Sequence, residues 1–451
     1  MHDVERHYDV IIVGAGIVGS ALLYSLSRYS DLGSILLVEK YGEAARLNSN
    51  SRNNGQTLHF GDIETTYTLE KAKRVKEASE MLLRYAITLP EKERNKIMQR
   101  VPQMVLAVGD EEVEFLRRKF DHRFREIFPK VRELNRNQLS AVEPNVVKGR
   151  DKGEELSAIY SGYGYNIDFG ELSKSFIKRA VSKMGPKIRL SFNEKAIRAA
   201  EKGGRYVLTT NKGAYTSDFI VFATGAQSLY FAKSMGYGKN LSIMAVMGAF
   251  YQSRRVVNGK VYVVQEGKIP FLGTHCDPDV NRSDKSRFGP TITPYPFLEK
   301  SRPSTIREYM GSIGFDIDYV KSISNMLSNG EIRNAFARNL AYSIPILGKY
   351  GFVRHEVKKI IPLLEYRDMT YDRTSGGIRP QIIDKSKRDI SVGDAKLSGE
   401  GIIFNITPSP GASSCLRIAL ENSLEIASHL GKQFDKDRFY RDFAGGPGSY
   451  I

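Results

Sequence analysis

The fold is decided by the stretch Tyr8–Tyr29, "YDVIIVGAGIVGSALLYSLSRY". It opens with a short apolar and β-branched run, typical of a buried strand, and a helical pattern closes it. Between the two stand Gly14, Gly16 and Gly19 in the spacing GxGxxG. In such a unit the first glycine allows a tight turn, the second lets the backbone approach a pyrophosphate, and the third lets helix and strand pack closely. The stretch therefore predicts a Rossmann-like unit that binds a dinucleotide.

A second strand supplies an acidic residue at the expected distance. The segment "SILLVEK" ends near Glu39, which lies 20 residues beyond Gly19. A carboxylate at this spacing suits the hydroxyls of a ribose, while the N-terminus of the preceding helix faces the phosphate charge. Because strand, helix and acid follow one another in the right order, we predict that Glu39 contacts the nucleotide.

A later segment favours FAD over NAD. In "YTSDFIVFATGAQS", residues 219–222 are a buried strand, and Ala223 and Gly225 bring the chain back past the nucleotide. A late return strand of this kind is typical of FAD-dependent oxidoreductases with an N-terminal fingerprint. We expect FAD to be bound non-covalently, because no Cys or His stands in these stretches as a tether. The roughly 180 residues between the two nucleotide segments are too many for a loop and must contain inserted structure.

The predicted fold class is therefore α/β, α+β overall, with a Rossmann-like FAD-binding domain and an inserted mixed-sheet substrate domain. We place the FAD-binding domain in three parts, and the substrate-binding structure between them. The expected boundaries are 1–75 (FAD-binding, first part), 76–160 (mainly helical insertion), 161–235 (FAD-binding, second part), 236–370 (substrate-binding) and 371–451 (FAD-binding, C-terminal part).

Composition limits the class of protein. Of 451 residues, 41% are hydrophobic and 26% are charged, and no apolar run approaches the about 18 residues of a membrane span. The start of the chain leaves no room for a signal peptide, so we expect a cytoplasmic protein. Cys276 and Cys415 lack the spacing of metal ligands, and we predict no metal. The net charge of +16 implies an acidic partner. Without a zinc knuckle or recognition helix we expect no nucleic acid, which leaves anionic lipid or a small di-acid.

A polar segment follows the nucleotide unit. Arg46, Ser51, Asn53 and Asn54 stand in "RLNSNSRNNGQTLH" with almost nothing to bury. An exposed turn would explain such a composition. Directly after a dinucleotide unit, however, compact donors suit the pyrophosphate and the flavin carbonyls. We therefore predict that these four residues bind the cofactor.

Here the chain resembles a known family, the malate:quinone oxidoreductases, over most of its length. One departure is Arg52, which stands where longer members of the family carry Trp; this chain contains no Trp. The resemblance rests on these stretches: "SRNNGQTLHFGDIETTY" from Ser51, "VPQMVLAVGDEEVEFLRRKF" from Val101, "EPNVVKGRD" from Glu143, "YGYNIDFGELSKSFI" from Tyr163, "PFLGTHCDP" from Pro270, "FGP" from Phe288, "GIRPQIID" from Gly377 and "PSPGASSCL" from Pro408.

The resemblance implies an enzyme that oxidises (S)-malate to oxaloacetate with FAD and passes the electrons to a membrane quinone, ubiquinone or menaquinone, in the tricarboxylic acid cycle and respiratory chain. Such a protein would lie peripherally on the cytoplasmic membrane, attracted by anionic lipid. Arg379 is the expected anchor of a substrate carboxylate, with Gln381 from the same motif also binding substrate. His59 and His275 would divide the roles of base and ligand of the distal carboxylate, with Gln56 as a donor.

The resemblance also implies that a C-terminal helix supports the reduced flavin. We expect the helix to begin at Ala412, after a turn, so that its free N–H groups face the negative charge of the reduced ring. The residues predicted to contact the cofactor there are Pro410, Gly411, Ala412 and Ser413.

Several alternatives stay open. The same fold would serve a soluble oxidase of a 2-hydroxy acid such as 2-hydroxyglutarate, with oxygen as acceptor, because one methylene changes binding by only about 1–3 kcal/mol. A non-catalytic FAD-fold protein, like the GDP-dissociation inhibitors, is disfavoured by the intact nucleotide motif. For membrane contact we consider the stretch Tyr350–Tyr366, whose apolar residues at near-helical spacing either meet lipid or belong to the core.

Overall fold

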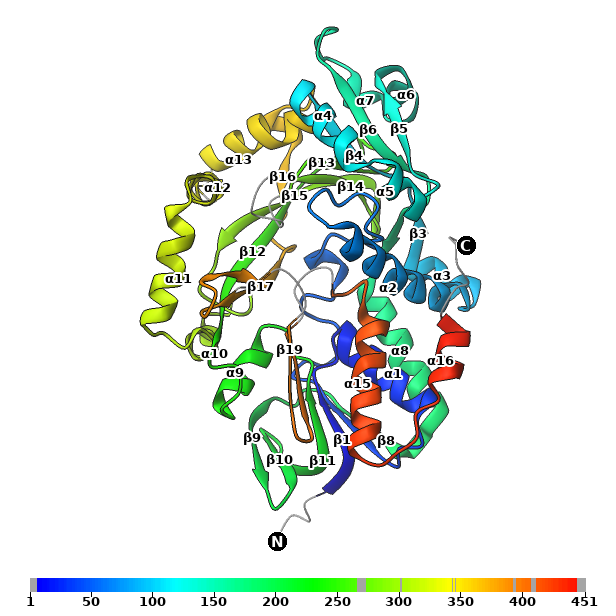
Figure 1. Ribbon diagram of the computed structural model, residues 1–451, viewed down its shortest axis with the longest axis vertical. Coiled ribbons are helices and arrows are strands. Elements are labelled where there is room, and N and C mark those ends of the chain that lie inside the picture. Colours follow the sequence, from blue (N-terminus) through cyan, green and yellow to red (C-terminus); the bar gives the residue numbers. More distant parts are fainter. Residues whose placement is uncertain are drawn as a thin grey trace.

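A computed structural model describes residues 6–265, 273–300, 302–342, 344, 346–391, 395–406 and 411–443. The chain builds two large sheets, one near the N-terminal end of an elongated molecule and one in its other half (Figure 1). Segments remote in sequence alternate between them. The structure therefore has the mixed α/β architecture that the sequence predicts.

The first sheet grows outward from the N-terminal strand. β1 (Arg6–Val13) pairs in parallel with β2 (Ile35–Val38) and with β11 (Ala214–Phe222), so that Val13 lies beside Phe222. The predicted return strand is thus confirmed. The order is β19-β20-β11-β1-β2-β8, with β10 paired to β11 and β9 paired to β10. The remaining strands are β8 (Ile188–Ser191), β9 (Ala196–Lys202), β10 (Arg205–Thr210), β19 (Ala395–Gly399) and β20 (Ile402–Ile406).

Helices bury one face of this sheet. α1 (Ile17–Tyr29) lies between α8 (Phe169–Met184) and α15 (Cys415–His429), and α2 (Leu69–Ile87) and α16 (Lys436–Phe443) pack outside them. The aromatic rings of Tyr24, Tyr85 and Phe176 meet in this layer with centroids 4.4–5.3 Å apart. This packing fixes the N-terminus of α1 at the carboxyl ends of the parallel strands, where ligands bind in open α/β sheets.

The second sheet has the order β18-β17-β12-β15-β14-β13-β4-β6-β5, with β16 beside β12. Its pairs are antiparallel except for β13 with β4. Its strands are β4 (Gln103–Val108), β5 (Arg132–Asn135), β6 (Leu156–Ser161), β12 (Leu241–Arg254), β13 (Lys260–Val263), β14 (His275–Asp279), β15 (Arg282–Pro294), β16 (Thr370–Tyr371), β17 (Gly377–Asp384) and β18 (Asp389–Ser391).

Two of the expected segments are distributed differently from our boundaries. Segment 76–160, expected to be mainly helical, supplies β4, β5 and β6 to the second sheet. These short strands stand between segments with a strong helical pattern. The helical pattern is therefore the one that the sequence of this segment mainly shows. Segment 371–451 is shared, because β17 lies in the second sheet and β20 in the first.

Short helices complete the structure. In Figure 1, α10–α13 follow one outer edge of the molecule beside the second sheet. The elements are α3 (Glu91–Ile97), β3 (Met98–Arg100), α4 (Asp110–Lys119), α5 (His122–Ile127), α6 (Arg136–Val142), α7 (Pro144–Val147), β7 (Tyr165–Ile167), α9 (Gln227–Ser234), α10 (Ile306–Ile313), α11 (Ile317–Ser328), α12 (Gly330–Ala341), α13 (Leu347–Phe352), a π-helical turn (Val353–Val357) and α14 (Lys358–Ile360).

Within Tyr350–Tyr366, the five apolar residues that stand at near-helical spacing do not face solvent. Val353, Val357, Ile360, Ile361 and Leu364 are each at most 3% exposed and belong to the core beneath the second sheet. The hypothesis that this stripe touches a membrane is therefore wrong, since a buried face cannot meet lipid. Among the described residues, no helix combines the length and the hydrophobicity that crossing a bilayer requires.

Candidate active site

The dinucleotide turn has no space for side chains. Gly14 has a φ of +105°, and a Cβ there would lie 2.6 Å from the carbonyl oxygen of Ala223. A Cβ on Gly19 would lie 2.0 Å from the carbonyl oxygen of Gly14. Both contacts are too short for any carbon, so the turn closes against α1 and β11 only with glycine.

The first turn of α1 and Glu39 define the nucleotide end of the site. Glu39 accepts hydrogen bonds from the N–H groups of Ala15 (2.9 Å) and Tyr41 (3.0 Å), and burial raises the pKa of its carboxyl group. Ser49 Oγ accepts from the N–H of Ile17 at 3.0 Å. An acid, a glycine turn and the N-terminus of a helix thus meet at one place, which fits the ribose and pyrophosphate of a dinucleotide.

A cavity extends from this end to the second sheet and gathers most of the predicted site residues. Gly19 lies in the helix behind the turn, Ser51 does not line the cavity, and Pro410 lies outside the described residues. The predicted residues that line it are Gly14, Gly16, Glu39, Arg46, Asn53, Asn54, Gln56, His59, Ala223, Gly225, His275, Arg379, Gln381, Gly411, Ala412 and Ser413.

The polar segment uses many of its side chains to build itself. The amide of Asn53 donates to the carbonyl of Leu47 at 3.0 Å, and the amide of Asn54 donates to the carbonyls of Asn48 (3.0 Å) and Asn50 (2.8 Å). These short amides therefore replace water around a tightly folded backbone that forms a cavity wall. Arg46 is paired with Glu43, with Nη1 and Oε1 3.0 Å apart. Cofactor contacts for these residues remain predictions.

Two residues of the segment turn towards the second sheet. Gln56, at a φ of +55°, donates to the carbonyl of Ser51 (3.1 Å) and to Asp279 (3.4 Å), and its amide oxygen accepts from the N–H of Val280 (2.9 Å). Ser51 Oγ accepts from Asn281 at 2.7 Å. Both polar groups are thus engaged in joining the segment to the loop between β14 and β15. The donor role of Gln56 and the cofactor role of Ser51 therefore stay predictions, and both roles would compete with these hydrogen bonds.

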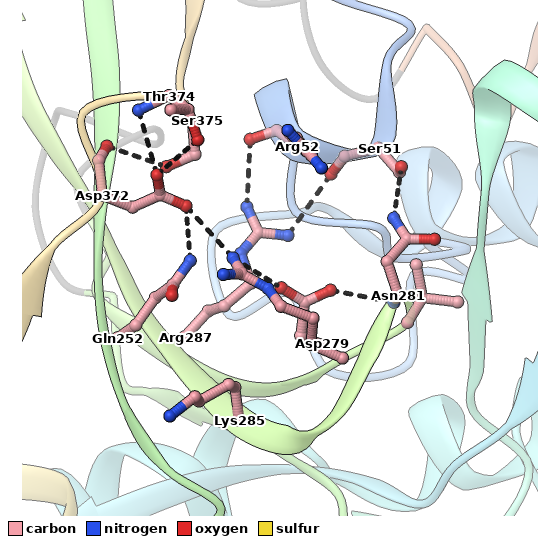
Figure 2. A network of polar contacts seen from close by, with 12 residues as sticks. Ser51, Arg52, Gln252, Asp279, Asn281, Lys285, Arg287, Asp372, Thr374 and Ser375 are labelled. Carbon is pink, nitrogen blue, oxygen red and sulfur yellow. Dashed lines mark hydrogen bonds and ion pairs between the residues drawn. The ribbon is translucent and has the colours of Figure 1, made fainter.

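Arg287 holds the polar segment in place through backbone carbonyl groups of that segment. Its side chain is 1% exposed and donates to the carbonyls of Ser51 (3.3 Å), Arg52 (3.4 Å) and Asn54 (3.0 Å). Figure 2 shows the guanidinium group pointing at this backbone, with Asp279 and Asp372 beside it. Burial lowers the pKa of Arg287, and these carboxylates act in the opposite direction. A buried cation with carboxylate neighbours and three acceptors is well satisfied, and it fixes the wall of the cavity.

Asn48 holds the same segment to the strand that carries Arg379. Its side chain donates to the carbonyl of Ile378 at 2.7 Å and accepts from the N–H of Ile378 at 3.1 Å. The amide thus pairs with the backbone of β17 as a neighbouring strand would. The position of Arg379 relative to the cofactor segment depends on this pair of hydrogen bonds.

His59 is one of two histidines that line the cavity with a carboxylate behind them. Its Nδ1 lies 2.5 Å from Glu64 Oε1, and its side chain is 22% exposed. The backbone N–H of His59 donates to Ser413 Oγ at 3.0 Å. The last contact joins the segment before α2 to the turn before α15.

His275 is the more deeply buried of the two. Its Nδ1 lies 2.7 Å from Asp277 Oδ2, and its ring stacks on Tyr262 with centroids 4.7 Å apart. Burial lowers the pKa of His275, although Asp277 opposes the effect. Burial alone would raise the pKa of Asp277, but His275 and Lys260 lower it to about 2. His275 is thus a neutral imidazole held beside an ionised carboxylate.

Lys260 supports this pair from within the sheet. It is fully buried, donates to the carbonyl of Gly55 (3.0 Å) and to Thr57 Oγ1 (2.8 Å), and lies 3.6 Å from Asp277 Oδ1. Burial lowers its pKa to about 8. The hydroxyl of Tyr262 lies 2.6 Å from Thr57 Oγ1. Hydrogen bonds thus link Lys260, Thr57 and Tyr262, and the ring of Tyr262 stacks on the imidazole of His275.

Arg379 brings an unpaired positive charge to the cavity. It lies on β17 opposite Val246, and it has no hydrogen-bonding or ion-pair partner within the described part of the chain. Burial lowers the pKa of its guanidinium group. Desolvating a cation without a counter-ion is costly unless a ligand supplies one. Arg379 thus suits a carboxylate, and Gln381, two residues along the same strand, faces the same cavity.

The C-terminal helix begins later than expected. α15 starts at Cys415, not at Ala412, because residues 411–414 form turns in which Cys415 N–H donates to the carbonyl of Ala412 at 3.3 Å. Gly411, Ala412 and Ser413 nevertheless line the cavity. The prediction that this turn faces the flavin remains a prediction.

Comparison with known proteins gives the family. The model of the family "Malate:quinone oxidoreductase (Mqo)" matches residues 6–428. A probable malate:quinone oxidoreductase of Campylobacter jejuni is 37% identical over 96% of this chain and 98% of its own length. The malate:quinone oxidoreductase of Helicobacter pylori (strain J99) is 36% identical over 98% of this chain and 99% of its own. The chain belongs to the malate:quinone oxidoreductase family.

A solved structure has a fold similar to that of this chain. The L-α-glycerophosphate oxidase of Mycoplasma pneumoniae, solved with FAD bound, superposes with a TM-score of 0.63 at 18% identity, covering 94% of this chain and 95% of that one. As a member of the malate:quinone oxidoreductase family, the chain is an FAD-dependent oxidoreductase that oxidises malate. Its glycine turn, Glu39 and the cavity beyond them fit that cofactor.

Several residues that shape the site of this family member could not be predicted from the sequence. Glu64 and Asp277 back the two histidines, and Lys260, Asn48 and Arg287 hold the surrounding wall. The only available signal was proximity, since Glu64 and Asp277 each stand within five residues of their histidine. Nothing in the sequence pattern distinguishes the other three from ordinary residues.

Proposed function

We propose that the chain oxidises (S)-malate to oxaloacetate at the end of the cavity lined by Arg379, His59 and His275, and that a quinone takes up the electrons. The observation that carries the proposal is the meeting of an unpaired guanidinium group with two carboxylate-backed imidazoles around one cavity. A di-acid with a hydroxyl group needs a cation, a second donor and a base.

Arg379 anchors one carboxylate of malate. A guanidinium group binds a carboxylate with two parallel hydrogen bonds, which fixes the orientation of C2 as well as its position. Because burial already disfavours the bare cation, binding an anion there also relieves the cost of that burial.

His275 is the base in this scheme. With a proton on Nδ1 towards Asp277, its Nε2 lone pair accepts the proton of the C2 hydroxyl group. The lowered pKa keeps the imidazole neutral near pH 7, as a base must be before reaction. His59 holds the second carboxylate, with Glu64 behind it. FAD, when bound, supplies the acceptor for the hydride that leaves C2.

The acceptor is the finer part of the proposal. The family description and the names of the relatives include quinone, and a quinone with an isoprenoid tail resides in a bilayer. The protein would then work at a membrane surface, where its net charge of +16 favours anionic lipid.

Rapid mixing of the FAD-loaded protein with malate tests the roles of the residues. His275→Asn is expected to slow flavin reduction at least about a hundredfold while FAD stays bound, and His59→Asn to weaken malate binding more than it slows reduction. A wild-type rate of flavin reduction together with wild-type malate affinity in both variants would show that neither imidazole takes part.

Steady-state rates test the acceptor separately. Malate oxidation should be much faster with a short-chain ubiquinone or menaquinone analogue than with air, and NAD should not serve. Comparable rates with oxygen would assign the chain to the soluble oxidases instead. The same assay with 2-hydroxyglutarate in place of malate decides between the two di-acids.

A further inference from the structure

An exposed apolar surface lies where α12 meets α13. The side chains of Leu340, Ile344, Ile346, Leu347 and Tyr350 are 58%, 51%, 73%, 72% and 58% exposed. We call these five residues the tip. Single exposed hydrophobic side chains are common on soluble proteins, but five within one helix junction are a marker of an interaction surface.

The charge around the tip has one sign. Residues 332–355 contain Arg333, Arg338, Lys349 and Arg354 and no Asp or Glu. The next acid along the chain, Glu356, is partly buried; it accepts hydrogen bonds from Tyr342 and Thr274, and its Oε1 lies 3.9 Å from Arg338 Nε. Apolar side chains in a basic frame match the composition of segments that lie in the interface of a membrane.

The tip faces outward while the residues that follow it face inward. Phe352, Val353 and Val357 are at most 3% exposed and pack into the core beneath the second sheet. Figure 1 shows α12 and α13 at the outer edge of the molecule. The buried residues hold the junction to the protein, so the five exposed side chains are presented on a supported structure.

We propose that the tip is the surface by which this protein docks on a bilayer that contains anionic lipid. The apolar side chains enter the boundary between headgroups and acyl chains, and Arg333, Lys349 and Arg354 meet lipid phosphates. The inference rests on the proposed quinone acceptor, because a lipophilic acceptor requires the enzyme to reach the bilayer. It replaces the buried stripe considered from the sequence.

The tip is connected to the active site. Glu356, in the π-helical turn after α13, accepts from Thr274 Oγ1 at 2.9 Å and from Tyr342 Oη at 3.1 Å. Thr274 precedes His275, which lines the cavity. The segment that supports the tip is therefore hydrogen-bonded to the strand that carries the proposed base. Docking through the tip places this wall of the enzyme on the side of the membrane-bound acceptor.

Co-sedimentation with vesicles tests the proposal on the FAD-loaded protein. The probe is phosphatidylcholine with about one third phosphatidylglycerol, compared with pure phosphatidylcholine and without quinone. The wild-type protein should pellet with the anionic vesicles and be released by salt. The double variant Ile346→Ser with Leu347→Ser, and separately Lys349→Glu with Arg354→Glu, should each reduce the bound fraction at least about fivefold.

Matched controls stand on the far sheet. Ile197, 52% exposed on β9, gives Ile197→Ser as the apolar control, and Lys187→Glu with Lys202→Glu gives the same change of charge. These variants should bind vesicles like the wild type. All variants should keep FAD and oxidise malate with a soluble dye, which shows that they are folded.

Each possible outcome either supports or overturns the proposed docking surface. If the wild type does not bind anionic vesicles, or if the tip variants bind as well as it does, the proposal is overturned. If the tip variants change the oligomeric state in sedimentation equilibrium and leave vesicle binding intact, the tip is a contact between copies of the chain, and the proposal also fails. If binding depends on the tip but quinone is not reduced, the docking surface stands and the proposed acceptor fails.

Discussion

At the scale of single residues, the site depends on charges whose partners were brought together by the fold. Within the described residues Arg379, which is partly buried, has no hydrogen-bonding or ion-pair partner, whereas the more deeply buried Arg287 has three carbonyl acceptors and nearby carboxylates. Arg379 is therefore suited to bind an anionic ligand, whereas Arg287 stabilises the folded structure.

The first prediction concerns the anchor. Arg379→Lys should bind FAD normally and lose at least about a hundredfold in kcat/KM for malate, because an ammonium group keeps the charge but not the two parallel hydrogen bonds. Arg254→Lys, at the exposed end of β12, is the control and should behave as wild type. An unchanged kcat/KM in Arg379→Lys would remove Arg379 from the proposed mechanism.

The second prediction concerns Asp62, whose side chain is fully buried and accepts from Gln103 at 2.8 Å. Burial, assisted by Glu64, raises its pKa to about 7. The folded protein then holds a proton that the unfolded chain releases near pH 4, so this residue's stabilisation is lost as the pH rises from about 4 to about 7.

Asp62→Asn removes that dependence. Between pH 4.5 and pH 7.5 the wild type should lose at least about 1 kcal/mol more in free energy of unfolding than the variant, measured by urea unfolding. Glu143, whose pKa burial also raises to about 7, contributes to both proteins alike and cancels in the difference. The exposed Asp284→Asn serves as control. Parallel curves for wild type and Asp62→Asn would contradict the assignment.

Residue types in a motif could be predicted, but their partners could not. Gly14, Gly19 and Glu39 follow from a spacing that reflects local geometry. The pairing of Asp277 with Lys260 depends on β13 and β14 lying side by side, which is a tertiary fact. The side chain of Gln56 shows the same limit, because a polar group near a cofactor is equally able to hold a loop in place.

At the scale of elements, the packing of β1 and β11 against α1 is the most tightly determined feature of the fold. Gly19→Ala should abolish or strongly weaken FAD binding and destabilise the protein by about 1–3 kcal/mol, because the added Cβ would lie 2.0 Å from a backbone oxygen that cannot move independently. Flavin content after purification and urea unfolding measure the two effects.

Gly162→Ala is the matched control for that variant. A Cβ at Gly162 would have its nearest neighbour, in Tyr160, at 3.8 Å, which is ordinary contact. This variant should keep its flavin and its stability. If Gly19→Ala were equally harmless, the close approach of helix and strand would not be required for the cofactor.

Elements with a strong periodic pattern could be predicted from the sequence. Strands whose formation depends on pairing with neighbouring strands could not. β4 and β6 each have six residues and are stabilised by lying beside β13 and β5 in the sheet. A pattern of apolar residues around Val353 and Val357 indicates only that one face is buried or bound; which of the two applies is decided by what packs on it.

At the scale of the whole molecule, the cofactor cavity belongs to neither sheet alone. Its walls come from the dinucleotide turn, the polar segment, β14, β17 and the turn before α15. Stretches from both ends of the chain must therefore be in place before the cavity exists, so binding of FAD and folding of the two halves are coupled.

The last prediction is that no covalent bond holds the flavin, so that this coupling is reversible. Among the described residues no cysteine lines the cavity; Cys276 and Cys415 are buried, and burial raises the pKa of both thiols. The imidazoles of His59 and His275 have their Nδ1 atoms beside carboxylates. Acid precipitation should release all the flavin into the supernatant, and adding FAD to the stripped protein should raise its Tm, since only the folded state binds it. Yellow colour that stays in the pellet would show a covalent link, and a Tm unaffected by FAD would show that the cavity forms without its cofactor.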